Sequence, residues 1–140
     1  MRRLPRNAGV SPASLSILLL LSTCASCTNL HTSTPSHGQI NHIVIAWLKN
    51  PGDENDRQKL INTSRTFLQI PGVVSVSAGR PIPSTRPVVD STFDVAVVIV
   101  FRDEAALRAY DAHPIHKQAV EEVLKPLVKK QIVYDLTDAQ

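Results

Sequence analysis

One short segment carries most of the residues that could do chemistry. Tyr110, His113 and His116 place a phenol and two imidazoles within seven positions, and Pro114 lies between the two histidines. Proline disfavours helical geometry in the residue before it and suits the first turn of a helix. We therefore predict that one helix ends near His113 and that another begins at Pro114.

This arrangement favours a neutral imidazole at position 116. His116 falls in the first turn of the second predicted helix, where unpaired backbone amides oppose protonation of the ring. A neutral imidazole can accept a proton, as a general base must. A second interpretation stays open, in which the His113-Pro114 step only caps the helix and lets both helices pack on a sheet.

The surrounding chain alternates between strand and helix patterns. β-branched and apolar residues predict strands at 40–48, 73–78, 93–101 and 128–136, with the second at an edge of the sheet. Asp53 is the expected N-cap of a helix that ends at Ile70-Pro71-Gly72, and its apolar spacing is carried by Leu60, Ile61, Ser64, Phe67 and Leu68.

Two further helices and a loop complete this pattern. Asp103 is the expected cap of a helix through Tyr110, and Pro126 is expected to end a helix at 114–124. The proline-rich segment 80–87 predicts an irregular loop. Strand, helix, strand, strand, two helices and strand is the order of a ferredoxin-like α+β fold with a split βαβ arrangement.

Both faces of two predicted strands are apolar. In the third strand, one face carries Phe93, Val95, Val97, Ile99 and Phe101, and the other carries Ala96, Val98 and Val100. In the first strand, one face carries Val44, Ala46 and Leu48, and the other carries Ile43, Ile45 and Trp47. The helices of so short a chain can cover one face of a four-stranded sheet. We expect a second copy of the chain to cover the other face, giving a homodimer with a barrel-like core.

The first 27 residues have the order of a bacterial-type export signal. Three arginines precede an apolar run at 15–21, which is too short to span a bilayer as a helix. Ala25-Ser26-Cys27 resembles the end of a lipobox, so we predict a lipoprotein anchored to the membrane through Cys27. Simple cleavage near Ala25 or Ser26, giving a periplasmic or secreted protein, is the alternative. Residues 28–39 are polar and predict a disordered tether, followed by a folded domain at 40–137.

Charge and motifs exclude several function classes. The chain has 15 Lys and Arg against 12 Asp and Glu, and three of the arginines lie in the signal, which leaves 12 against 12. A neutral mature protein gives no support to nucleic-acid binding. No nucleotide fingerprint or nucleophile elbow is present, so we predict no cofactor. His42, His113 and His116 lack the i, i+4 spacing of a metal site, and we predict no metal.

Several of these features together resemble the stress-responsive A/B barrel (Dabb) family of the dimeric α+β barrel superfamily. The resemblance covers about residues 41–135 and rests on the strand at 93–101 and on three motifs: His42-Ile43-Val44, Ile70-Pro71-Gly72-Val73 and Tyr110-x-x-His113-Pro114-x-His116. It implies a small dimer with a recurrent histidine at position 42. One member of the family is a polyketide cyclase, and its catalytic tyrosine and histidine correspond by the motif to Tyr110 and His116.

Two functions follow as hypotheses. In the first, the chain is an exported, membrane-tethered homodimer that binds a small apolar or aromatic molecule, or a partner, in a stress or envelope role. His42, His113 and Trp47 are then the candidate ligand contacts. In the second, it is a cofactor-free cyclase, lyase or isomerase acting on an enolisable carbonyl compound, with His116 as base and Tyr110 as its hydroxyl partner.

Overall fold

The computed structural model of this chain describes residues 38–137. The predicted export signal, Cys27 and all but the last two residues of the predicted tether lie outside the described residues. Within the described range, no helix combines the length and the apolar character needed to cross a membrane.

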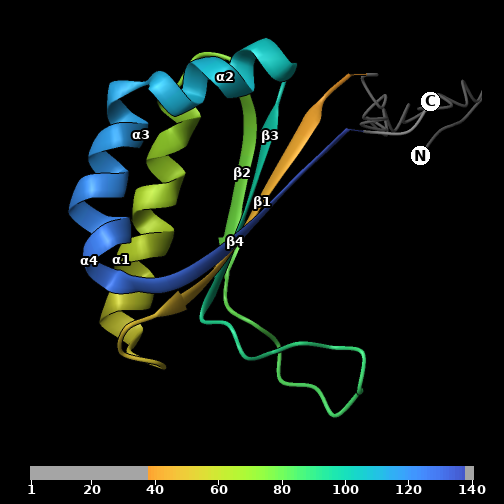
Figure 1. Cartoon of the computed structure of the whole chain (residues 1–140), viewed down its shortest axis with the longest axis vertical. Helices are drawn as coiled ribbons and strands as arrows, with labels where there is room; N and C mark the ends of the chain where they lie inside the picture. Colours follow the sequence, from red (N-terminus) through yellow and green to blue (C-terminus); the bar gives the residue numbers. More distant parts are fainter. Residues whose placement is uncertain (1–37, 138–140) are drawn as a thin grey trace, which may run out of the picture. The chain divides into compact units, whose positions relative to one another are not determined.

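Four strands form one antiparallel sheet with the order β2-β3-β1-β4 (Figure 1). In chain order the elements are β1 (Ile40–Leu48), α1 (Glu54–Arg65), the 3-10 turn η1 (Thr66–Gln69), β2 (Val73–Gly79), β3 (Val95–Phe101), α2 (Glu104–Ala112), α3 (Pro114–Ala119), the π-helical turn η2 (Val120–Leu124), α4 (Lys125–Leu127) and β4 (Val128–Thr137). The predicted ferredoxin-like order and the edge position of β2 are confirmed.

Side-chain caps fix where the helices begin. Asp53 accepts a hydrogen bond from the backbone N–H of Asp56 at 2.9 Å, and Asp103 accepts one from Ala106 at 2.7 Å, as expected. His113 ends α2 and also caps α3, because its Nδ1 accepts from the backbone N–H of Ile115 at 3.3 Å. The predicted break between two helices at the His113-Pro114 step is therefore confirmed.

The predicted start of the third strand is wrong by two residues. β3 begins at Val95 rather than at Phe93. Asp94 is buried, and its carboxylate accepts hydrogen bonds from the backbone N–H groups of Leu48 and Gly52, both at 2.8 Å. This side chain ties the end of β1 to the turn before α1, and the strand starts only after it.

The helix predicted at 114–124 changes its winding. It is α-helical only to Ala119, and in the π turn that follows the N–H of Lys125 donates to the carbonyl oxygen of Val120, five residues earlier. Pro126 has no N–H to continue an α-helical ladder, and its ring crowds the preceding turn. The helix nevertheless continues one residue past Pro126, to Leu127.

The α-helix predicted after Asp53 ends at Arg65, although its apolar spacing continues to Leu68. Leu68 shares the helical spacing of Leu60 and Ile61, yet 53% of it is exposed. The 3-10 turn η1 begins at Thr66, and its tighter winding no longer follows the spacing of an α-helix.

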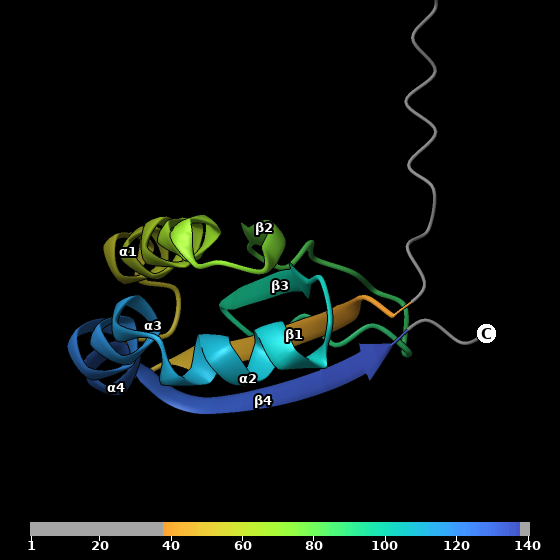
Figure 2. The ribbon, with the colours of Figure 1, turned by 90° about the horizontal axis from the view of Figure 1, so that it is seen from above.

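The helices all lie on one face of the sheet (Figures 1 and 2). Val95 and Phe101 of β3 and Leu48 of β1 are fully buried beneath them. α1 and α2 pack on β2 and β3, whereas β4 has little helix cover and its Val133 is 41% exposed on the same face. The helix layer therefore leaves a gap above β4.

No helix of residues 38–137 covers the other face of the sheet, which is mainly apolar. Polar side chains lie around its margins: Asn41, Ser75, Ser77 and Lys130. Its apolar side chains come from three neighbouring strands: Ile43, Ile45, Trp47, Ala96, Val98, Val100, Ile132, Tyr134 and Leu136. Tyr134 is 54% exposed. We refer to these nine residues as the open face.

Candidate functional site

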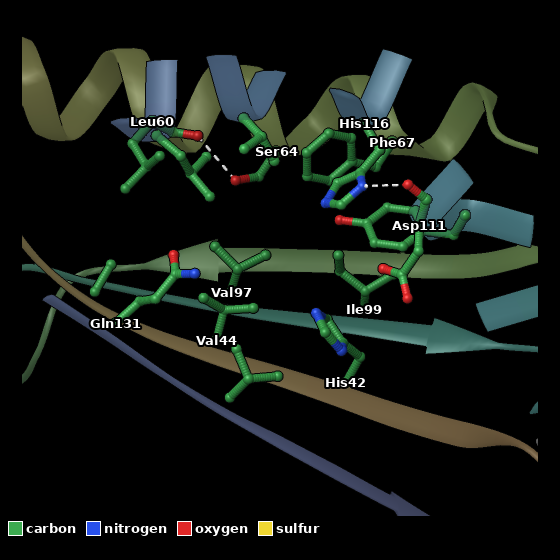
Figure 3. A pocket seen from close by; sticks show the side chains of 15 residues that line it. His42, Val44, Leu60, Ser64, Phe67, Val97, Ile99, Asp111, His116 and Gln131 are labelled. Atoms are coloured by element: carbon green, nitrogen blue, oxygen red, sulfur yellow. Dashed lines mark hydrogen bonds between the residues drawn. The ribbon is translucent and has the colours of Figure 1, made fainter. Parts of the chain in front are cut away.

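A pocket of about 210 Å³ lies between the helices and the sheet (Figure 3). His42, Tyr110, Asp111 and His116 line one end of it. Valine, leucine and isoleucine side chains line most of the remainder, supplied by β1, β3, β4, α1 and η2. The pocket is therefore an apolar slot with a cluster of polar rings at one end.

Tyr110 and His116 lie against each other in this cluster. Their ring centroids are 4.1 Å apart, and the ring planes are inclined by 33°. Tyr110 comes from the last turn of α2 and His116 from the first turn of α3, so the turn at His113 brings the two rings together. Phe67 and Phe101 pack around Tyr110 with centroid distances of 5.4 and 5.0 Å. The tyrosine ring is thus held in place, and only 2% of the residue is exposed.

The hydrogen bond of His116 defines its tautomer. Nδ1 lies 3.3 Å from the backbone carbonyl oxygen of Asp111, and because a carbonyl can only accept, Nδ1 carries the hydrogen (Figure 3). Burial lowers the pKa of His116, although the Asp111 carbonyl and carboxylate oppose this shift. The ring is therefore neutral near pH 7, with its lone pair on Nε2. The sequence predicted this state from the helix end, whereas burial is the main cause in the structure.

Tyr110 is the complementary donor. Burial, followed by the nearby Asp111 carboxylate, raises the pKa of Tyr110, so the phenol keeps its proton. Its hydroxyl has no hydrogen-bond partner within residues 38–137, yet no buried side-chain atom there is left unsatisfied. The hydroxyl oxygen is therefore accessible from the pocket and can donate to an oxygen placed there.

His42 approaches the same rings from the sheet. Its Nδ1 lies 2.6 Å from Oδ1 of Asp135, which stands opposite it on β4, and its centroid is 5.9 Å from that of Tyr110. The carboxylate holds the hydrogen on Nδ1 and fixes the orientation of the ring. Nε2 of His42 is thereby left for the pocket (Figure 3).

The structure brings together three of the five candidate residues. His42, Tyr110 and His116 line the pocket, but His113 and Trp47 do not. The ring of His113 is used as a helix cap, and Trp47 belongs to the open face, where its Nε1 donates to Thr92 Oγ1 at 3.1 Å. In the described part of the chain, no group of three His, Cys, Asp or Glu residues is placed to hold a metal ion.

Sequence reasoning missed Ser64, Gln131 and Asp135 as residues beside the site. Asp135 pairs with His42, and Gln131 stands opposite Ala46 on the helix-facing side of β4. The register of the first strand against the last would have revealed both. Ser64 was predicted only as part of the helical spacing that faces the core, whereas in the structure it also lines the pocket from α1.

A pH-dependent stability follows from the lowered pKa of His116. On unfolding, this pKa rises to its ordinary value of 6.5, so the unfolded chain binds more protons as the pH falls below that value. The contribution of neutral His116 to the free energy of unfolding is fully present above pH 6.5. It is lost as the pH falls through the lower pKa that His116 has in the folded state. Urea unfolding between pH 7.5 and 5 should show the wild-type protein losing more stability than His116→Gln. A stability difference between the two proteins that does not change with pH would contradict this expectation.

The antiparallel sheet, its single helix layer and the pocket between them define a ferredoxin-like α+β domain. The sequence profile of the stress responsive A/B barrel domain (Dabb) family matches residues 40–138, and the chain belongs to this family. No curated protein sequence matches the chain.

Solved structures show the same fold. A Dabb family protein with a ferredoxin-like fold from Mesorhizobium loti is 25% identical, with a TM-score of 0.61, and the match covers 74% of this chain and 100% of that chain. A dimeric ferredoxin-like protein of unknown function from Thermobifida fusca is 19% identical, covering 76% and 96%, with a TM-score of 0.61. A putative antibiotic biosynthesis monooxygenase from Bacteroides thetaiotaomicron is 18% identical, covering 74% and 91%, with a TM-score of 0.54.

Proposed function

We propose that this domain binds a small, mainly apolar molecule that carries an oxygen function. The observation that supports the proposal most strongly is a neutral imidazole beside a phenol at one end of an apolar pocket, where the phenol hydroxyl has no partner among residues 38–137. The phenol donates to a carbonyl or hydroxyl oxygen of the ligand. Nε2 of His116 accepts from a ligand hydroxyl, and the apolar walls contact the rest of the molecule.

The size of the pocket limits the ligand. A cavity of roughly 150 Å³ in another protein is large enough to hold benzene, and this pocket measures about 210 Å³. An aromatic or alicyclic ring with one or two short substituents therefore fits. Acetophenone has such a ring and one carbonyl oxygen, which makes it a suitable probe.

Removing only the hydroxyl of Tyr110 tests the proposal. Tyr110→Phe keeps the ring against His116 but removes the donor, so we expect acetophenone to bind about five- to tenfold more weakly, as for the loss of one hydrogen bond. Titration calorimetry measures the affinity. Tyr134→Phe, which alters the exposed tyrosine of the open face, is the matched control and should bind as the wild type does. Equal affinity in Tyr110→Phe and the control would contradict the proposed binding site.

A second candidate function is cofactor-free acid–base chemistry on an enolisable carbonyl compound. The unprotonated Nε2 of His116 next to the Tyr110 phenol favours it, because such a pair can remove an α-proton while the phenol stabilises the developing oxyanion. Deuterium exchange at the α-carbons of small ketones tests this function. Exchange that His116→Ala abolishes would support catalysis. No exchange with any ketone tested would leave ligand binding as the function.

We infer that two copies of the chain associate through the open face. A two-fold interface would bury nine largely apolar residues on each copy, and no helix of residues 38–137 covers them. The Thermobifida fusca protein, which has the same fold, is described as dimeric. The dimer would join two sheets face to face and leave each pocket on the outside, beneath its own helices.

We also propose that the protein is exported and tethered to a membrane through a lipid on Cys27, where it serves a stress or envelope role. The support is the order of arginines, apolar run and Ala25-Ser26-Cys27 in the sequence. Expression in a bacterial host with labelled fatty acid should label the wild-type protein and not Cys27→Ser. An unlabelled wild-type protein recovered in the soluble periplasmic fraction would support simple cleavage instead.

A further inference from the structure

Two polar side chains interrupt the apolar wall beyond the rings at His116: Gln131 at the far end of the pocket, and Ser64 between Leu60 and Phe67. Ser64 enters from α1, and Gln131 enters from β4 on the opposite side (Figure 3). Leu60, Leu124 and Ala46 also line this part of the pocket. Neither polar residue has a role in the polar cluster formed by His42, Tyr110 and His116.

Ser64 offers an acceptor to the pocket. Only 3% of the residue is exposed, and its hydroxyl donates to the backbone carbonyl oxygen of Leu60 at 2.8 Å. This bond uses the hydroxyl hydrogen and leaves the lone pairs of Oγ. A ligand hydroxyl or amide group at this point in the pocket could donate to them.

Gln131 lies on the sheet side of the slot, and Ser64 lies on the helix side. Gln131 stands opposite Ala46 in the register of β1 and β4, on the helix-facing side, and Figure 3 shows its amide rising from the sheet towards Leu60. Because the helices leave β4 largely uncovered, the side chain is exposed, and it has no hydrogen-bond partner among residues 38–137. An amide both donates and accepts, so it can bind the same ligand group as Ser64.

The spacing along the strands separates the two polar ends of the pocket. Gln131 pairs with Ala46 and Asp135 with His42, so the two ends are four residues apart along β1. At roughly 3.3 Å per residue this is about 13 Å between backbone positions, and the side chains at both ends reach inwards. Val44, Val97 and Val133 fill the interval with apolar surface.

From this arrangement we propose that Ser64 and Gln131 form a second hydrogen-bonding subsite of the pocket. The ligand is then a bifunctional molecule, with one oxygen function at the Tyr110 end, a hydroxyl or similar group at Ser64 and Gln131, and a ring between them. A para-hydroxylated aromatic ketone has this chemistry. The inference rests on the proposed binding function and specifies the class of ligand.

Three ketones separate this subsite from simple apolar binding. We expect the full chain to bind 4-hydroxyacetophenone about tenfold more tightly than acetophenone, because two polar partners await its hydroxyl. 4-Methylacetophenone, which carries a methyl group in place of the hydroxyl and cannot form these hydrogen bonds, should not show this gain. Titration calorimetry with the purified protein gives all three affinities.

Two variants assign the preference to the subsite. Gln131→Leu and Ser64→Ala should each reduce the preference for 4-hydroxyacetophenone over acetophenone, and the double variant should abolish it. Gln58→Leu, on the exposed side of α1, is the matched control and should keep the preference. Because Gln131 is exposed, its replacement leaves the core intact and keeps the test valid if Ser64→Ala folds poorly.

The outcomes distinguish the subsite from the binding function itself. Equal affinities for acetophenone and 4-hydroxyacetophenone in the wild type, or a preference that survives in Gln131→Leu, would overturn the subsite only. Binding of acetophenone that Tyr110→Phe weakens would still uphold the first polar end. No binding of any of the three ketones would overturn both the subsite and the proposed function.

Discussion

Gly72→Ala is expected to destabilise the domain by about 3 kcal/mol or more, which combines the cost of a strained backbone with that of an overpacked contact. Gly72 has a φ of +90°, and a Cβ added there would meet the Cβ of Ala106 at 2.5 Å. Ala106 lies on the buried side of α2, one turn before Tyr110. The close approach at Gly72 therefore sets the height of α2 above the sheet and, with it, the position of Tyr110.

Two comparisons separate the causes of this loss. Gly52 has a φ of +81° with nothing within 4 Å of an added Cβ, so Gly52→Ala should cost only the backbone term, about 1–2 kcal/mol. Ala106→Gly in the Gly72→Ala background should restore part of the stability, because it removes the facing methyl group. Urea unfolding measures all of these variants. If Gly72→Ala were no less stable than Gly52→Ala, the close packing of α2 on this turn would be contradicted.

Val98→Asp is expected to turn the proposed dimer into a monomer, weakening association by about a hundredfold or more. Val98 lies on β3 near the middle of the open face, with Ile43 beside it on β1. A carboxylate buried there without a partner loses its hydration, and two-fold symmetry would bring a second carboxylate into the same interface. The pocket lies on the opposite face of the sheet, so acetophenone binding should be retained.

Sedimentation at micromolar concentration measures this effect. Asn62→Asp introduces the same charge on the exposed side of α1 and should leave the dimer unchanged. A wild-type protein that is monomeric at this concentration, or a Val98→Asp variant that remains dimeric, would contradict association through the open face.

The elements could be predicted because their signals are local. The bounds of β1 follow from one uninterrupted β-rich run, and the caps at Asp53 and Asp103 follow from side chains that bond to amides three residues ahead. The π turn at Val120–Leu124 could not be predicted this way. It depends on how the chain accommodates Pro126 while Val123 stays buried in the core, which is a tertiary requirement.

The site was predictable only as far as neighbouring residues define it. The predicted break at His113-Pro114 put Tyr110 and His116 at the adjoining ends of two helices, and strand alternation gives His42 the same face as Val44 and Ala46. Asp135 and Gln131 depend on the pairing of the first and last strands, which are separated by most of the domain and shift register between Trp47 and Leu48.

Two of the predicted ligand contacts, His113 and Trp47, lie outside the pocket because of their backbone positions. His113 points its Nδ1 at the first turn of α3, because Pro114 directs the chain so that the ring becomes the cap. Trp47 follows the alternation of β1 to the open face, where Lys130 Nζ lies 4.4 Å from its ring centroid. Both residue types are common in ligand sites, but their backbone positions direct them elsewhere.

The protonation state of His116 is the most direct test of the binding site. Nitrogen NMR of the histidine rings, recorded between pH 8 and 5 on the wild type and on Tyr110→Phe, resolves each ring nitrogen. The structure predicts a neutral His116 with its hydrogen on Nδ1 and a pKa below 6.5, and an Nε2 signal that moves when the Tyr110 hydroxyl is removed. A His116 that titrates like a solvated imidazole, near pH 6.5, and ignores Tyr110→Phe would contradict it.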